Sequence, residues 1–458
     1  MDRAMLYRTI WRWHFYAGLF VIPFILLLSL SGSLFLFKPQ MDAWEESAWR
    51  GPPTAQNSSA PAASADVQVA VAQAHLAGAA VRAYRLPRGA GEPVVVHMVL
   101  PRGGGARDVF VTPSGKIGAV VNPDQRWSNW IARLHGSLLV GLPGKLLVET
   151  AACWAIMLIL SGLYLWWPRQ RGLAGILWPR LRSGRGMFWR DLHGVTGFWV
   201  SALAMVLLLS GLPWTEGWAT AFRFVRAEMG WVSAAPQDWK GGQALRTSSV
   251  DEHDHSAAAM PSPDRQPALP TVNFSTILWL ARNEHLSFPV IIQPPHAPST
   301  FGPPNGDHWK LTSETQNRPQ IRTILFDAQT AAVVSRTGFA DKHPIDRVIN
   351  YGIAWHEGQL FGWINQLIGV LTGVALCTVA ISGTMMWWRR RPQRAGMAGA
   401  AGAGTSLLGA PPILPQGRAR ALLFLLLLPA LLLPMLGLSL IVVAAVDGLV
   451  MLLRRQRA

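Results

Sequence analysis

The chain has 458 residues, of which 50% are hydrophobic and 14% are charged, and it contains several long apolar runs. A soluble protein needs more polar surface, and apolar runs of about 18 residues or more predict membrane-spanning helices. The net charge of +16 does not indicate a nucleic-acid partner, because the basic residues lie in short loops beside the apolar runs, as membrane topology favours.

The first apolar run extends from about residue 17 to residue 37. A cleaved signal peptide has a shorter core and a small-residue cleavage site, so we expect this run to remain as a span. Arg3, Arg8 and Arg12 precede it and place the N-terminus in the cytoplasm.

Residues 38–134 face outward in this orientation, and they combine an Ala/Ser/Pro-rich linker with a compact soluble pattern. The pattern predicts one helix and several strands, so we expect an α+β module. The expected elements are a linker at 55–65, a helix at 67–79, a strand at 94–100 and a hairpin at 108–121 that turns at Pro113-Ser114-Gly115.

The second and third spans are expected at about 146–167 and 194–215. The loop between them, 168–190, holds six arginines and no acidic residue, which is typical of a cytoplasmic loop. Cys153 and Cys377 lie inside apolar spans, so we expect packing residues and no disulfide or thiolate metal site.

Residues 216–355 form a second outward region, with a polar insert near 246–270 and then a second α+β pattern. A fourth span at about 364–388 returns to three arginines, Arg389 to Arg391. The strands expected in this region are at 289–293, 308–312 and 321–338.

A Gly/Ala-rich linker at 395–404 leads to a last apolar stretch at 421–453, interrupted by Pro429, Pro434 and Gly437. One straight helix of that length would be about 50 Å long, against a hydrocarbon core of about 30 Å. The stretch is therefore either one kinked span or a tight hairpin. The terminal arginines 454, 455 and 457 favour the hairpin, which returns them to the cytoplasm.

An internal repeat organises the four core spans. His135 and His356 each precede an apolar span, and each is followed by a Gly six residues later, by a Ser-Gly pair 26 residues later and by a Trp-Trp pair 31 residues later. His14 and His193 are each followed by a Gly at the fourth position and by a Ser-Gly pair at the seventeenth. We interpret the chain as a duplication of span, outer module and span. The Ser-Gly pairs begin at Ser31, Ser161, Ser210 and Ser382.

The predicted topology places one histidine pair near each membrane surface. His14 and His193 open outward-going helices and lie near the cytoplasmic face, whereas His135 and His356 open inward-going helices and lie near the outer face. An ionisable residue in a membrane helix is a functional candidate. Two imidazoles from facing helices can ligate a haem iron from both sides.

Gly18 and Gly197 lie one turn after His14 and His193 on the same helix face and leave room for a flat ring, so we include them among the cofactor-binding residues. The competing interpretation is that each histidine caps a helix or anchors it at the interface. A zinc site fits less well, because no Cys or carboxylate lies at ligand spacing. The remaining histidines have no matched partner, and we expect them at the surface: 75, 97, 253, 255, 285, 296, 308 and 343.

These motifs resemble the PepSY-associated transmembrane proteins, a family that includes bacterial inner-membrane ferric-siderophore reductases. The resemblance covers nearly the whole chain and is carried by His14 with Gly18, by the Leu-His-Gly segments at 134–136 and 192–194, and by the Ser-Gly and Trp-Trp pairs. It implies periplasmic PepSY-like modules, b-type haem bound by His14, His135, His193 and His356, and electron delivery to ferric chelates.

The leading hypothesis is therefore an inner-membrane reductase with two haem b groups that passes electrons to a ferric siderophore. Its donor is a cytoplasmic protein or a quinol, because the short cytoplasmic loops contain no nucleotide-binding motif. We expect a basic, aromatic rim for the substrate, made of Arg126, Trp127, Trp130, Arg133, Tyr351 and Trp355.

Two alternatives stay open. One is a non-enzymatic membrane protein whose outer modules bind peptides or a peptidase. The other is an iron-chelate transporter, although we expect no buried charge in the four core spans, which a transporter would need. Only Asp447, in the unrepeated tail, lies inside an apolar run in this interpretation.

The predicted fold is an α-helical integral membrane protein with four core spans, two periplasmic α+β modules and a C-terminal kinked helix or hairpin. The predicted segments are a first span at 1–37, a first module at 38–134, the second and third spans at 135–215, a second module at 216–355, a fourth span at 356–391, a cytoplasmic linker at 392–420 and a hydrophobic segment at 421–458.

Overall fold

A computed structural model of the chain shows two compact units, each assembled from segments far apart in the sequence. The first unit contains Met1–Leu36, Ile131–Val232 and Trp355–Ala458, and the second contains Phe37–Trp130 and Ser233–Ala354. The structure describes residues 3–49, 62–89, 91–167, 175–180, 184–231, 272–298, 306–390 and 419–456. The polar insert, the Gly/Ala-rich linker and most of the linker at 55–65 lie outside these residues, as does much of the basic loop.

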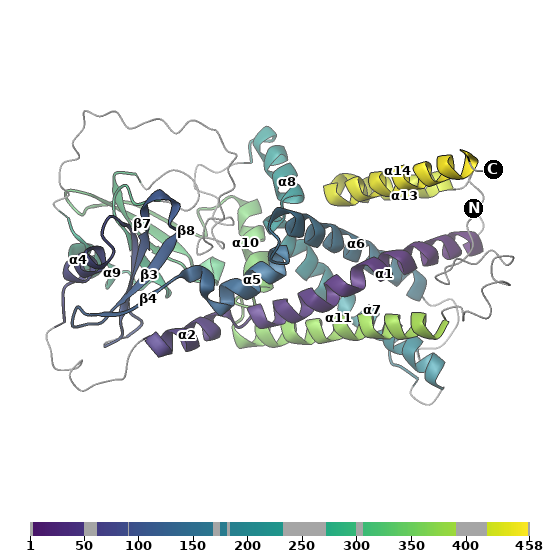
Figure 1. Cartoon of the computed structure of the whole chain (residues 1–458), viewed down its shortest axis with the longest axis horizontal. Helices are drawn as coiled ribbons and strands as arrows, with labels where there is room; N and C mark the ends of the chain where they lie inside the picture. Colours follow the sequence, from purple (N-terminus) through teal and green to yellow (C-terminus); the bar gives the residue numbers. More distant parts are fainter. Residues whose placement is uncertain are drawn as a thin grey trace. The chain divides into compact units, whose positions relative to one another are not determined.

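Four helices of the first unit are long and apolar enough to cross a membrane, among the described residues. α1 packs against α6 and α11, and α7 packs against the same two helices, so the four form a ring in which α1 and α7 take opposite places (Figure 1). Each expected span corresponds to one of them, although α1, α6 and α7 begin 14, four and nine residues earlier than expected and α11 begins one residue earlier. Their bounds are α1 Arg3–Phe35, α6 Leu142–Trp166, α7 Arg185–Gly211 and α11 Trp363–Arg390.

Two glycines separate histidine-bearing helices from the spans that follow. His135 lies in α5 (Trp127–Ser137) and His356 is the last residue of α10 (Pro344–His356). Gly141 and Gly362 then adopt left-handed φ values of 66° and 59°, which glycine tolerates best. The expectation that these histidines open the spans themselves is therefore wrong, because the chain turns between each histidine and its span.

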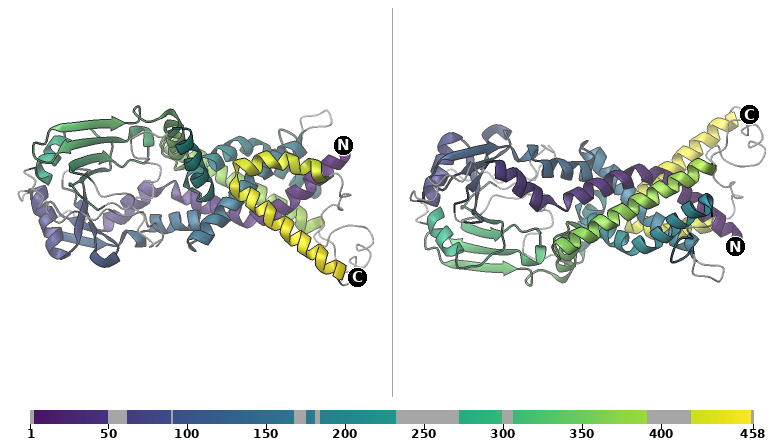
Figure 2. Two further views of the ribbon diagram at one scale, coloured as in Figure 1. Left: turned by 90° about the horizontal axis from the view of Figure 1, so that it is seen from above. Right: turned by 90° about the horizontal axis from the view of Figure 1, so that it is seen from below.

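The C-terminal stretch is a helical hairpin, which is the favoured one of the two predicted alternatives. α13 (Ala419–Leu432) and α14 (Pro434–Gln456) pack together, and the left view of Figure 2 shows their V-shaped arrangement. Proline suits the first turn of a helix but not its continuation, so the break falls before Pro434. The hairpin packs on α6, where Trp154 Nε1 donates to Ser439 Oγ at 3.0 Å and buried, free Cys153 lies in the same apolar cluster.

The second unit contains one continuous antiparallel sheet of eight strands in the order β4-β3-β2-β1-β5-β6-β7-β8. We expected two separate modules, but β1 pairs with β5, where Tyr84 lies opposite Ile292. This pairing joins the two four-stranded halves into one sheet. Strand β1 was also not expected. The strands are β1 Ala80–Arg85, β2 Val94–Val99, β3 Ala106–Val111, β4 Ile117–Val121, β5 Val290–Gln293, β6 His308–Ser313, β7 Arg322–Asp327 and β8 Val333–Gly338.

Helices α4 (Ala65–His75) and α9 (Phe274–Ala281) pack with the apolar face of this sheet in one core. The Asp66 carboxylate of α4 accepts hydrogen bonds from the backbone amides of Phe274 and Ser275 at 2.9 and 3.2 Å, so it caps the first turn of α9. Phe110 points to the opposite face, because side chains alternate along a strand, and there it meets Trp49 of α2 (Lys38–Trp49) with ring centroids 5.2 Å apart.

The remaining described elements are short. They are η1 Pro101–Gly103, η2 Pro123–Gln125, η3 Leu212–Trp214, α8 Gly217–Glu228 and η5 Arg318–Gln320.

Candidate functional site

The four singled-out histidines meet in two pairs inside the first unit. The ring centroids of His14 and His193 are 6.4 Å apart with an interplanar angle of 90°, and those of His135 and His356 are 6.3 Å apart with an angle of 67°. These are the two pairs that the topology argument predicts. His14 and His193 come from α1 and α7, the opposite members of the helix ring, so their imidazoles meet across its interior.

Each histidine packs against a Ser-Gly pair of a neighbouring helix. A Cβ atom added at the glycine would lie 2.9 to 3.2 Å from the histidine Cε1, closer than real Cβ atoms normally approach. The space at all four positions therefore favours glycine, most strongly at Gly32, where the distance is 2.9 Å. The sets are His14 with Ser161-Gly162, His135 with Ser31-Gly32, His193 with Ser382-Gly383, and His356 with Ser210-Gly211.

The serine hydroxyls fix the tautomer of two histidines. Ser161 Oγ donates its proton to the backbone carbonyl of Met157 at 2.7 Å, so it accepts a hydrogen bond from Nδ1 of His14 at 2.9 Å. Ser31 Oγ likewise donates to the carbonyl of Leu27 at 2.8 Å and lies 3.1 Å from Nδ1 of His135. This arrangement favours the tautomer with the proton on Nδ1 in both rings.

The other two histidines reach the same tautomer through a backbone carbonyl. Nδ1 of His193 donates to the carbonyl oxygen of Val379, and Nδ1 of His356 donates to that of Leu207, each at 2.9 Å. A carbonyl oxygen can only accept, so Nδ1 is protonated in both rings. In all four neutral imidazoles the lone pair is then on Nε2, the form in which histidine ligates a metal.

The spacing within each pair suits two ligands on opposite sides of one metal ion. A histidine nitrogen ligates a metal at about 2.0–2.1 Å and lies about 1.1 Å from its own ring centroid, so two trans imidazoles have centroids about 6.3 Å apart. The observed 6.4 and 6.3 Å agree with this value.

The donor set of each pair indicates which kind of metal group fits. No group of three or more His, Cys, Asp or Glu that could hold a metal ion occurs within the described part of the chain. Two imidazoles alone do not complete the coordination of a zinc ion, which takes four ligands. They do complete an iron whose other four positions are filled by a porphyrin, so the residues fit a haem with two axial histidines.

The two pairs lie near opposite ends of the same helices. His14 and Ser31 are 17 residues apart on α1, and Ser31 contacts the other pair through His135. At a rise of about 1.5 Å per residue this separation is about 25 Å along the helix axis, close to the hydrocarbon thickness of about 30 Å. One pair therefore belongs near each surface of a membrane that α1 crosses.

The structure places Gly18 and Gly197 in helix packing. A Cβ atom added to Gly18 would lie 4.0 Å from Leu158, and one added to Gly197 would lie 4.0 Å from Val379, which are ordinary contacts. Neither approaches a histidine ring as the glycines of the Ser-Gly pairs do. Their role in cofactor binding stays a prediction. The glycines that do contact the histidine rings are those of the four Ser-Gly pairs, which were not predicted as site residues although their repeated spacing was visible in the sequence.

A buried carboxylate in α6 overturns the expectation that the core spans contain no buried charge. Glu149 has 0% exposed surface, and its carboxylate accepts hydrogen bonds from the backbone amides of Gly217 and Trp218 at 2.8 and 2.7 Å. It thereby caps the first turn of α8, whose free amides and positive helix end suit an anion. These two hydrogen bonds give the buried Glu149 carboxylate a structural role.

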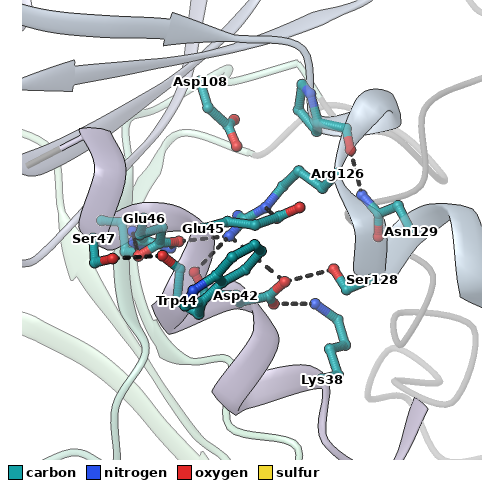
Figure 3. Close-up of polar contacts among 12 residues, drawn as sticks. Lys38, Asp42, Trp44, Glu45, Glu46, Ser47, Asp108, Arg126, Ser128 and Asn129 are labelled. Carbon is teal, nitrogen blue, oxygen red and sulfur yellow. Dashed lines mark hydrogen bonds and ion pairs between the residues drawn. The ribbon is translucent and has the colours of Figure 1, made fainter. Parts of the chain in front are cut away.

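The expected substrate rim is only partly exposed. In the second unit Trp127, Trp130 and Tyr351 are 59%, 41% and 48% exposed, but Arg126 is buried at 6%. Arg126 lies 3.2 Å from Glu45 and 2.9 Å from Glu46 (Figure 3), so it is a structural ion-pair residue instead of a free cation at the surface.

The network around Arg126 ties α2 to the sheet and to the start of α5. Arg85 pairs with Glu46 at 2.9 Å, the amide of Trp127 donates to Glu45 at 2.8 Å, and Lys38 pairs with Asp42. Burial raises the pKa of the Asp42 and Glu46 carboxyls, but the neighbouring cations outweigh it and hold each pKa below its ordinary value.

His97 corrects a further expectation. It was expected at the surface but is 8% exposed, and its Nδ1 lies 2.7 Å from the carboxylate of buried Asp108. Burial raises the pKa of Asp108, but the contacts with His97, Arg126 and Arg85 outweigh burial and hold this pKa below its ordinary value.

A family model described as the PepSY-associated TM region matches residues 11–390. The match includes all four histidines and all four Ser-Gly pairs and leaves out the α13–α14 hairpin. A comparison with curated proteins found no match.

Proposed function

The chain belongs to the PepSY-associated transmembrane family, and from this premise we propose that it is a haem-containing membrane oxidoreductase that passes electrons to a ferric chelate. The observation that carries the proposal is the meeting of four histidines in two pairs, whose ring centroids are 6.4 and 6.3 Å apart, a spacing at which both rings of a pair could hold one metal. Each pair would hold one haem b.

Each helix pair would hold and orient its cofactor through the histidine tautomer. Nδ1 of every ring is engaged by a serine hydroxyl or a backbone carbonyl, which leaves Nε2 as the ligating atom and limits rotation of the ring. The bound iron porphyrin would supply reversible one-electron chemistry. The four helices that surround the two pairs, α1, α6, α7 and α11, are apolar enough to cross a membrane.

The direction of transfer follows from the predicted topology. Arginines before α1 and in the loop after α6 favour the cytoplasm for those ends of the helices, so the His14–His193 pair would lie near the cytoplasmic surface of the bacterial inner membrane. The His135–His356 pair would then lie near the periplasmic surface, with the eight-stranded sheet in the periplasm. Electrons from a quinol or a cytoplasmic donor would leave toward a ferric siderophore or a similar chelate.

The internal symmetry of the first unit supports a duplicated origin. Each half contributes one histidine to each pair, and each Ser-Gly pair contacts the histidine from its own half of the chain. We propose that duplication of an ancestral unit of span, module and span gave two equivalent histidine sites, one near each surface of the bilayer, between which electrons could pass.

The deciding experiment is absorption spectroscopy of the full chain purified from haem-replete cells. We expect a Soret band that shifts on reduction with dithionite. His14→Ala or His193→Ala should remove one haem, and His135→Ala or His356→Ala the other, whereas exposed His75→Ala should leave both. A colourless preparation would contradict the proposal and favour a peptide-binding membrane protein.

The substrate is tested on the reduced protein under anaerobic conditions. Adding a ferric chelate should return the oxidised Soret band, while the same chelator loaded with redox-inert gallium should leave the reduced spectrum unchanged. A reduced spectrum that persists with several ferric chelates would contradict reductase activity and leave haem binding intact.

A further inference from the structure

Trp166 carries a buried hydrogen-bond donor that the described residues do not satisfy. Its indole Nε1 has less than 1 Å² of accessible surface and no hydrogen-bond partner. A buried N–H without an acceptor is unfavourable in folded proteins, so this donor is available to an acceptor from outside the described residues.

The indole lies beside the His14–His193 pair. Trp166 follows Gly162 by one helical turn on α6, and Gly162 packs against the ring of His14. The Cδ1 atom of Trp166 lies 3.4 Å from the position of a Cβ atom on Gly194, the residue after His193. Because Nε1 is bonded to Cδ1, the unsatisfied N–H lies near α7 at Gly194.

The ring is held rigidly in this place. Trp166 stacks on Phe198 of α7 with ring centroids 4.0 Å apart and an interplanar angle of 9°. Such stacking between two helices fixes the indole plane and therefore the position of the N–H before any ligand arrives. The donor is thus preorganised at the edge of the site.

We propose that Trp166 Nε1 donates a hydrogen bond to a carboxylate on the edge of the cofactor held by His14 and His193. This inference rests on the proposed function, because the acceptor would be one of the two carboxylate side chains of a b-type haem. An indole N–H only donates, and its hydrogen bond to an ionised acceptor is about twice as strong as one to a neutral acceptor. Trp166 is therefore assigned as a binding residue that recognises the anionic edge of the ring.

The test compares two probes at one site. The full chain with His135→Ala and His356→Ala retains only the His14–His193 pair, and its apoprotein is titrated with haem b and with haem b dimethyl ester. The ester keeps the ring and the iron but removes the negative charges. We expect about a tenfold preference for haem b, and we expect Trp166→Phe, which keeps the stacking on Phe198, to lose most of it. The matched control is Trp167→Phe, whose side chain is 67% exposed.

The outcomes separate this inference from the proposed function. If the His135→Ala, His356→Ala protein binds haem b and its dimethyl ester with equal affinity, the proposed role of Trp166 is wrong. This comparison needs no Trp166 variant. A preference that survives Trp166→Phe unchanged would overturn it as well. Absence of any Soret band from the parent protein and from the unmodified chain would instead overturn the proposed function, and this inference with it.

Discussion

Ser161 accepts a hydrogen bond from Nδ1 of His14 at 2.9 Å and so links α6 to α1. Its counterpart Ser382 lies 3.3 Å from Nδ1 of His193, a ring that also donates to the carbonyl of Val379 at 2.9 Å. The two histidines of this pair are thus supported unequally. His193 keeps a partner when its serine is removed, whereas the contact of His14 depends on Ser161.

This inequality predicts different effects of two equivalent substitutions. Ser161→Ala should weaken haem binding at the His14–His193 pair by about tenfold or more, which is the usual effect of losing the group that orients a metal-ligating histidine. Ser382→Ala should change it much less, since the Val379 carbonyl still holds the ring. Titration of the apoprotein with haem measures both, and equal losses in the two variants would contradict the ordering.

Gly32 predicts a steric effect at the other pair. A Cβ atom on residue 32 would lie 2.9 Å from Cε1 of His135, so Gly32→Ala should displace the imidazole and abolish six-coordinate haem at the His135–His356 pair. Magnetic circular dichroism or resonance Raman spectroscopy would show one remaining bis-histidine haem. Gly448→Ala is the matched control, because nothing lies within 4 Å of that added atom. Two intact bis-histidine signals in Gly32→Ala would refute the close packing.

The histidine pairs could be predicted because their signal is periodic. Repeated spacing and alternating topology were enough to bring His14 to His193 and His135 to His356. The partner of each ring was harder to predict, since the Ser-Gly pair that contacts each histidine lies between 104 and 189 residues away in the sequence. Only the three-dimensional contact of Gly32 with His135 shows that the pair belongs to the site.

The single sheet and the buried ion pairs could not be predicted from local patterns. Strands β1 and β5 pair across two intervening membrane spans, and no feature of Tyr84 or Ile292 encodes that partner. Arg126 looked like a surface cation beside two tryptophans. Its burial depends on Glu45 and Glu46, about 80 residues earlier in the chain, which fold back against it.

Removal of Arg126 should destabilise the second unit. Arg126→Met removes the buried ion pairs with Glu45 and Glu46 and leaves Glu46 with Arg85 alone, and breaking a buried pair in this way costs about 3–5 kcal/mol. Unfolding of the β-sheet, followed by circular dichroism in the full chain, should occur at a clearly lower temperature. Arg336→Met removes an exposed ion pair with Glu284 and serves as the control, for which we expect no comparable shift. Equal stability of Arg126→Met and the parent protein would refute the role of the network.

The same network predicts how the stability of the second unit depends on pH. The pKa of Asp42, Glu46 and Asp108 is lowered in the folded chain because nearby cations and hydrogen bonds outweigh burial. A carboxyl whose folded pKa is lowered contributes stability above its ordinary pKa and loses that contribution as the pH falls through the folded value. The unfolding temperature should therefore stay nearly constant down to about pH 5 and fall below about pH 4.

The double variant Asp42→Asn with Glu46→Gln provides the control for this pH dependence. It cannot release or bind protons at these positions, so its unfolding temperature should be lower at neutral pH and should fall less steeply in acid. An identical acid slope in the variant and the parent protein would assign the pH dependence to other carboxyls.

Glu149 decides between a structural and a transport interpretation of the buried charge in α6. If it caps α8, Glu149→Leu should leave the amides of Gly217 and Trp218 without acceptors and destabilise the start of α8 by about 1–3 kcal/mol. Hydrogen exchange in nanodiscs should then show faster exchange in residues 217–220 and unchanged exchange in α11. Glu149→Gln retains an acceptor oxygen and should have a smaller effect. Loss of proton-coupled uptake of an iron chelate, with α8 fully protected in Glu149→Leu, would instead assign this carboxylate to a transport path.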